Sequence, residues 1–150
     1  ASWTPCHAHR EPVVRRVTIR RMTLRFDIRS LAVAAVLLVL LILLATLGAG
    51  LGWIRSFLGD TLAVIWVYFV LKTFLRAHVL TLAGLAFGMG AFVELGQYLA
   101  GELGWRIPNP VLRIVLGSTA DWWDMLAYSL GWIAVLAIEL PRQRATKTAP

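Results

Sequence analysis

Residues 31–47 read LAVAAVLLVLLILLATL, and this run decides the fold class of the chain. Thr46 is its one polar residue, and no charge interrupts it. A helix that crosses the hydrocarbon core of a bilayer needs roughly 20 mostly apolar residues. Because the apolar character continues through the glycines after Leu47, we expect a first membrane span over residues 31–52.

Three further segments outside this run have the same character. They are residues 60–76, 78–100 and 121–140, the last closed by Pro141. The composition agrees, since 59% of the 150 residues are hydrophobic, 15% are charged and the mean hydropathy is +0.72. A water-soluble domain is about half apolar and a quarter charged, and disordered chains are poorer still in apolar residues. The sequence therefore predicts an all-α integral membrane protein, a four-helix bundle over residues 31–140 with no room for a separate soluble domain.

The net charge of +7 indicates orientation rather than nucleic-acid binding. If the N-terminus is cytoplasmic, the inner segments hold Arg10, Arg15, Arg16, Arg20, Arg21, Arg25, Arg29, Lys72, Arg76, Arg142, Arg144 and Lys147. The outer segments then hold only Arg55, Arg106 and Arg113. Cytoplasmic loops of membrane proteins carry an excess of Lys and Arg. We therefore expect both termini inside, in a multi-pass protein of the inner (cytoplasmic) membrane that binds no nucleic acid.

The two ends of the chain are expected to be cytoplasmic tails, residues 1–30 and 141–150. Met22 starts the sequence MTLRFDIRS directly before the first span, so residues 1–21 are either a disordered or untranslated extension or a lipid-binding arm. Cys6, His7 and His9 have no second set of ligands in the sequence, so we predict no metal site and no cofactor.

Polar residues gather where the spans meet the outer surface. Asp60 opens the second predicted span, Glu94 lies near the end of the third, and Asp121 with Asp124 opens the fourth. Glu94 and Gln97 share a helical stripe with Gly90 and Gly101, and such glycines let another helix approach closely. We expect this stripe to face the inside of the bundle. The candidate ligand-binding cluster comprises Asp60, Tyr68, Glu94, Gln97, Arg113, Ser118, Thr119, Asp121, Asp124 and Tyr128.

A purely structural role is the competing interpretation of each acid. Asp60 and Asp121 stand at predicted helix N-termini, where a carboxylate caps free backbone N–H groups. Glu94 is inside a helix, so its structural role would be a pair with Arg113 or Arg55, or hydrogen bonds to Gln97 or Tyr128.

Three motifs in these spans resemble a known family. They are Gly59-Asp60 with Tyr68-Phe69, Glu94-x-x-Gln97, and LGSTADWWDMLAYSLG over residues 116–131. Together they resemble DUF2809, a family of small bacterial integral membrane proteins of unknown function, over about residues 24–140. The sequence is also distantly similar to VanZ-like proteins, although Val64 and Tyr128 replace the His and Asn of that pattern. Both resemblances imply a four-helix membrane fold with an acidic motif on the outer side, and neither implies a reaction.

Three classes of function remain open at this point. The first is an outer acidic pocket that binds a lipid-linked or cationic ligand. The second is a structural or accessory subunit of a larger membrane complex or a homo-oligomer, for which Gly84-xxx-Gly88 is a helix-packing signal. The third, a metal-dependent membrane enzyme, is less favoured because the sequence offers no nucleophile with a partnered base.

Overall fold

The computed structural model describes residues 23–104 and 121–148 of the chain. Four long helices dominate them: α1 (Ile28–Leu47), α2 (Trp53–Phe74), α3 (Val79–Glu102) and α5 (Trp122–Thr148). A short 3-10 helix, η1 (Gly48–Leu51), joins α1 to α2. Each long helix has the length and composition to cross a membrane. The prediction of an all-α, four-helix membrane fold is confirmed.

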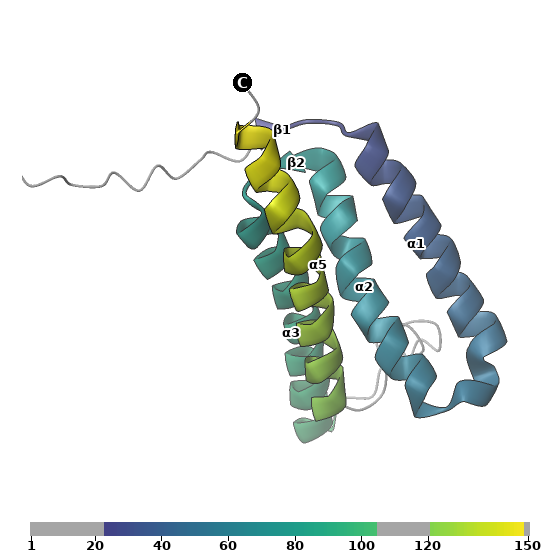
Figure 1. The fold of residues 1–150 in the computed structure, drawn as a ribbon. Coiled ribbons are helices and arrows are strands. Elements are labelled where there is room, and N and C mark those ends of the chain that lie inside the picture. Colours follow the sequence, from purple (N-terminus) through teal and green to yellow (C-terminus); the bar gives the residue numbers. More distant parts are fainter. Residues whose placement is uncertain (1–22, 105–120, 149–150) are drawn as a thin grey trace, which may run out of the picture.

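The helices form an open bundle in which α2 is central (Figure 1). α2 packs against α1 on one side and against α3 and α5 on the other. The buried core comes from α2, α3 and α5: Val64, Tyr68, Val79, Leu82, Ala83, Ala86, Tyr128 and Val135. In α1, by contrast, only Ser30 and Ala34 are buried, and its large apolar side chains are mostly exposed. Such a surface is stable in contact with lipid rather than water.

Close contacts at two glycines hold the three core helices together. A Cβ on Gly131 of α5 would lie 2.6 Å from the Thr61 carbonyl oxygen of α2. The Thr61 hydroxyl donates a hydrogen bond to the Ala127 carbonyl of α5, at 3.2 Å. On α3, a Cβ on Gly90 would meet the ring of Tyr128 at 3.1 Å. Small residues and hydroxyl hydrogen bonds of this kind are typical of helix packing in membranes.

Gly84 and Gly88 do not take part in this packing. Both are exposed, and a Cβ at either position would have no described atom within 4 Å. Within the described parts of the chain, the Gly84-xxx-Gly88 signal therefore marks an outward face of α3.

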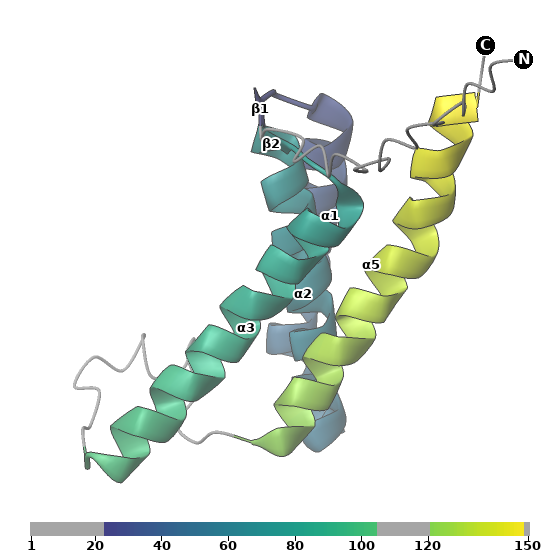
Figure 2. The same ribbon diagram turned by 90° about the vertical axis from the view of Figure 1, so that its left-hand side faces the viewer.

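A two-stranded antiparallel sheet closes one end of the bundle. β1 (Thr23–Leu24) pairs with β2 (Leu75–Arg76), so the segment before α1 lies along the α2–α3 connection. The C-terminal part of α5 lies at this same end (Figures 1 and 2). We call it the basic end, because it carries Arg25, Arg29, Lys72, Arg76, Arg142 and Arg144. The opposite end, where α1 meets α2 and α5 begins, is the acidic end and carries Asp60, Glu94, Asp121 and Asp124.

Asp27 anchors the start of α1 at the basic end. Its carboxylate accepts hydrogen bonds from the Ser30 hydroxyl, at 2.8 Å, and from the Arg29 backbone N–H, at 3.2 Å. This is an N-cap arrangement. The Ser30 hydrogen bond, together with that of the Arg29 N–H and the nearby Lys72 and Arg25 charges, lowers the pKa of Asp27 below the ordinary aspartate value of 3.8.

Three helix ends differ from the sequence prediction by more than a turn. α1 ends at Leu47 instead of residue 52, and the 3-10 helix η1 follows it. α2 begins at Trp53, two turns before the expected start at Asp60, because the chain turns at Gly52, whose φ of 52° favours glycine. α5 continues through Pro141 to Thr148 instead of stopping there. Proline leaves the carbonyl four residues earlier without its helical partner. That residue, Ala137, is exposed at the bundle surface.

Candidate functional site

Glu94 is the buried centre of the acidic end. Glu94 is only 7% exposed and lies on the face of α3 that packs against α5. One carboxylate oxygen accepts a hydrogen bond from the Tyr128 hydroxyl at 3.3 Å. The other accepts from the Asp121 backbone N–H, also at 3.3 Å. Glu94 and Gly90 face the bundle interior as expected, whereas Gly101 at the end of the same stripe is exposed and contacts no other helix among the described residues. Tyr128 is the partner of Glu94 that the structural interpretation named.

Asp60 is not a helix cap, and the structural role expected for it is wrong. Since α2 begins at Trp53, Asp60 lies inside the helix, about 10 Å from its start at 1.5 Å per residue. Its carboxyl group interacts electrostatically with Asp124 on α5 and with Ser56 one turn earlier on α2. Glu94 is a further electrostatic neighbour. The two acids are thus brought together from different helices.

Asp121 does have the predicted capping role. It directly precedes α5, and its Oδ1 accepts a hydrogen bond from the Trp123 backbone N–H at 3.1 Å. Its charge also acts on Glu94 and Asp124. Asp121 therefore starts the helix and at the same time adds a fourth carboxylate to the acidic end.

The structure divides the remaining candidate residues into three groups. Gln97 lies one turn beyond Glu94, and its side-chain oxygen is buried without a hydrogen-bond partner in the described structure. Tyr68 is not part of the acidic end, because eight residues of helix carry it about 12 Å from Asp60. Arg113, Ser118 and Thr119 lie outside the described residues.

The acids of this end have no cationic partner in the described ranges. Both salt bridges found in residues 23–104 and 121–148 belong to the basic end. Arg55, proposed from the sequence as a partner of Glu94, instead donates a hydrogen bond to the Ala45 carbonyl near the end of α1, at 3.2 Å. Its side chain fills the space beside Gly48, where a Cβ would lie 3.1 Å from the Arg55 Cγ.

Two cavities flank these acids. One, of about 320 Å³, is lined by Trp53, Ser56, Phe57, Asp121, Trp123 and Asp124. The other, of about 460 Å³, is lined by Ala91, Glu94, Leu95, Tyr98, Asp121, Trp122 and Met125. Both combine carboxylates with aromatic rings. Across the described residues, no three His, Cys, Asp or Glu side chains come together in a way that could hold a metal ion.

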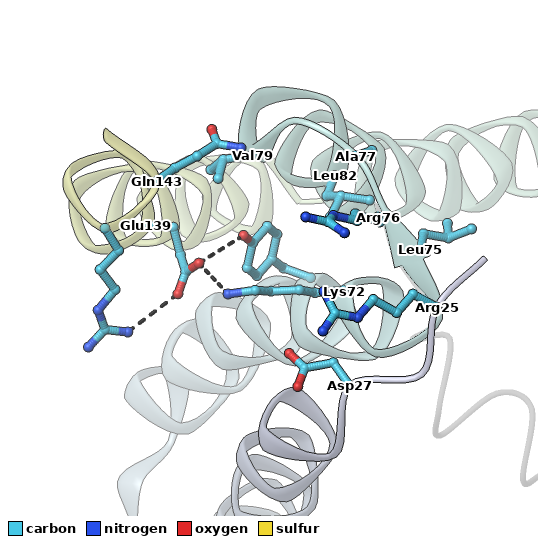
Figure 3. Close-up of a pocket in the computed structure, with 12 residues that line it drawn as sticks. Arg25, Asp27, Lys72, Leu75, Arg76, Ala77, Val79, Leu82, Glu139 and Gln143 are labelled. Carbon is cyan, nitrogen blue, oxygen red and sulfur yellow. Dashed lines mark hydrogen bonds and ion pairs between the residues drawn. The ribbon is translucent and has the colours of Figure 1, made fainter. Parts of the chain in front are cut away.

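A second polar cluster, at the basic end, was missed in the sequence. Glu139 of α5 is 4% exposed and forms an ion pair with Lys72 of α2. Tyr68 donates a hydrogen bond to the same carboxylate at 3.3 Å, and Arg142 approaches its other oxygen at 3.4 Å (Figure 3). The available signal was an acid inside an apolar span, the same signal that singled out Glu94.

Comparison with known proteins gives one match. The model of the family described as "Protein of unknown function (DUF2809)" matches residues 49–132. No curated protein and no solved structure matches the chain. The matched segment contains α2, α3 and the first part of α5, and with them every acid of the acidic end. Since it covers more than half of the 150 residues, the chain belongs to the DUF2809 family.

Proposed function

We propose that this DUF2809 member is a multi-pass membrane protein that binds a cationic group, free or carried by a lipid, at its acidic end. The observation that carries the proposal is the convergence of Asp60, Glu94 and Asp124 from three helices, with no salt bridge to any of them among the described residues. Neighbouring carboxylates repel one another, so a bound cation stabilises their arrangement.

The aromatic residues beside the acids favour an organic cation. Trp53, Phe57 and Trp123 line the same cavity as Asp124. Trp53 and Phe57 pack edge to face, with ring centroids 6.4 Å apart. Aromatic faces attract ammonium groups, and quaternary ammonium ligands are commonly held in such surroundings. Trp53 and Trp123 are both largely exposed, which gives the cavity access from the membrane surface.

The orientation predicted from the cations supports an outer-leaflet ligand. With the basic end in the cytoplasm, the acidic end lies at the outer face of the inner membrane. A lipid-linked amine could then reach the cavity from the outer headgroup region. The proposed activity is binding, and no chemical step is assigned to the acids. The similarity to VanZ-like proteins stays a prediction.

Choline chloride is a suitable probe for this site. We expect it to change the tryptophan fluorescence of the full chain in detergent micelles, at concentrations where sodium chloride has no effect. Asp124→Asn and Glu94→Gln should each weaken the choline response about fivefold or more, in the range of a lost charge-assisted contact. Glu102→Gln is the matched control, because this exposed acid ends α3 at the same end of the molecule and lines neither cavity.

Two results would contradict cation binding. One is a choline response no stronger than that to sodium. The other is an equal loss in Glu102→Gln, which would indicate only general surface charge. Native mass spectrometry of the same samples tests the accessory-subunit alternative. That alternative requires that the protein is detected with a stable partner or a second copy bound.

A further inference from the structure

A cavity of about 260 Å³ opens at the basic end, remote from the acidic cluster. It lies between the connection from α2 to α3, the segment before α1 and the last turns of α5 (Figure 3). Its charged lining consists of four cations, Arg25, Lys72, Arg76 and Arg142, and two carboxylates, Asp27 and Glu139. The cavity therefore carries an excess of positive charge.

Both carboxylates are already occupied by protein groups. Glu139 is bound by Lys72, Tyr68 and Arg142. Asp27 caps α1 and accepts hydrogen bonds from Ser30 and from the Arg29 N–H. Neither acid forms a salt bridge with Arg25 or Arg76 within the described ranges.

The pairing of β1 with β2 brings the backbones of Arg25 and Arg76 to one edge of the bundle, and both residues line the cavity. Arg76 belongs to β2 and pairs with Thr23, while the Arg25 N–H donates to the Phe74 carbonyl at 3.0 Å. In the view of Figure 3, the Arg76 and Arg25 side chains are drawn on opposite sides of Lys72, among the residues that line the cavity. Each guanidinium carries N–H donors that suit the oxygens of a phosphate, so the two arginines give the cavity a lining that favours such a group.

We propose that this cavity binds the phosphate of an anionic phospholipid headgroup at the basic end. A headgroup is favoured over a free phosphate because Leu75, Ala77, Val79 and Leu82 continue the lining beside the cations. These apolar side chains suit the glycerol and the first acyl carbons of a lipid. Basic pockets between transmembrane helices on the cytoplasmic side bind anionic headgroups in this manner.

Lipid titration of the full chain, followed by native mass spectrometry, tests the proposal. Phosphatidylglycerol should bind as one retained lipid, more tightly than phosphatidylcholine. Arg76→Gln and Arg25→Gln should each weaken its retention about fivefold, the effect of one basic residue near an anionic lipid. Arg29→Gln removes the same charge at the same end from a residue that does not line the cavity, so retention should stay within twofold of wild type. Arg76→Lys, which keeps the charge, should retain more lipid than Arg76→Gln.

Three outcomes would overturn this proposal. The first is equal retention of phosphatidylglycerol and phosphatidylcholine. The second is an equal loss in Arg29→Gln, which would indicate diffuse attraction to the positive end. The third is displacement of the lipid by an equal concentration of glycerol phosphate, which would make a soluble phosphate the ligand. Thermal unfolding of each variant separates loss of the site from loss of the fold.

Discussion

Glu139 of α5 and Lys72 of α2 form an ion pair in which the glutamate side chain is 6% exposed and the lysine side chain 29% exposed. The two residues are 67 positions apart in the sequence, so the pair joins two helices that are distant along the chain. The Lys72 stem also passes the rings of Tyr68 and Phe69, with its ammonium 5.8 and 5.5 Å from their centroids. The basic end is therefore held by a charged contact inside a largely apolar bundle.

Neutralising Glu139 alone should destabilise the protein strongly. Glu139→Gln leaves the Lys72 ammonium beside the bundle without its counter-charge, and we expect a loss of roughly 3 kcal/mol in unfolding free energy. This is the lower end of the usual range, since Lys72 keeps partial access to water. The double variant Lys72→Met/Glu139→Leu should lose less than Glu139→Gln, because it buries no unpaired charge.

Thermal unfolding in detergent measures these differences. Arg142→Gln is the control, since its 70% exposed side chain approaches Glu139 at 3.4 Å and such pairs contribute about 1 kcal/mol or less. A double variant less stable than Glu139→Gln would contradict the argument.

Gly131 should not tolerate even a methyl group. The added Cβ of Gly131→Ala would lie 2.6 Å from the Thr61 carbonyl, so α2 and α5 must separate. Overpacking of this kind costs about 1–3 kcal/mol. Gly84→Ala is the matched control, because its Cβ meets no described atom within 4 Å. We expect that control to be neutral or slightly stabilising. Equal loss of stability in both variants would show that the close approach at Gly131 is unimportant.

The unpaired oxygen of Gln97 offers a test that separates stability from binding. Because this oxygen is buried without a described partner, Gln97→Met removes a desolvated polar group, and we expect thermal stability to stay equal or rise. If the oxygen serves the cation site, choline binding weakens in the same variant. A fall in stability without a change in choline binding would assign Gln97 to the fold alone.

The Ser30 hydroxyl should make part of the stability depend on pH. The hydrogen bond from Ser30 lowers the pKa of Asp27 in the folded protein. Its contribution to the free energy of unfolding is therefore complete above the ordinary aspartate pKa of 3.8. The contribution is lost as the pH falls through the lowered folded pKa. Ser30→Ala should therefore reduce the Tm near pH 6, and its difference from wild type should shrink well below pH 3.8. A difference that is constant over this range would contradict the linkage.

The sequence predicted the helices well because the membrane imposes a simple rule. Every backbone group in a span must be paired within its own helix, so long apolar runs specify long helices. Helix ends were predicted less well. Gly59-Asp60 has the composition of a helix start, but the turn at Gly52 begins α2 earlier, and Pro141 does not stop α5.

The acidic end was predicted better than the basic end for a related reason. Glu94 and Asp124 are brought together by helical spacing and by the alternation of helix direction, both of which are visible in sequence. Tyr68 was wrongly assigned to the acidic end because it shares a face with Asp60 while lying about two turns away along the axis. The Lys72–Glu139 pair depends on the relative heights of α2 and α5, and no local pattern specifies these.

The strand pair at the basic end has a consequence for the order of assembly. Thr23 pairs with Arg76, so β1 cannot form its hydrogen bonds until residues more than fifty positions downstream are present. During synthesis, α1 and α2 must both have left the ribosome before β1 and β2 can pair. The strand pair therefore fixes the start of α1 at the basic end only after α2 has also been synthesised.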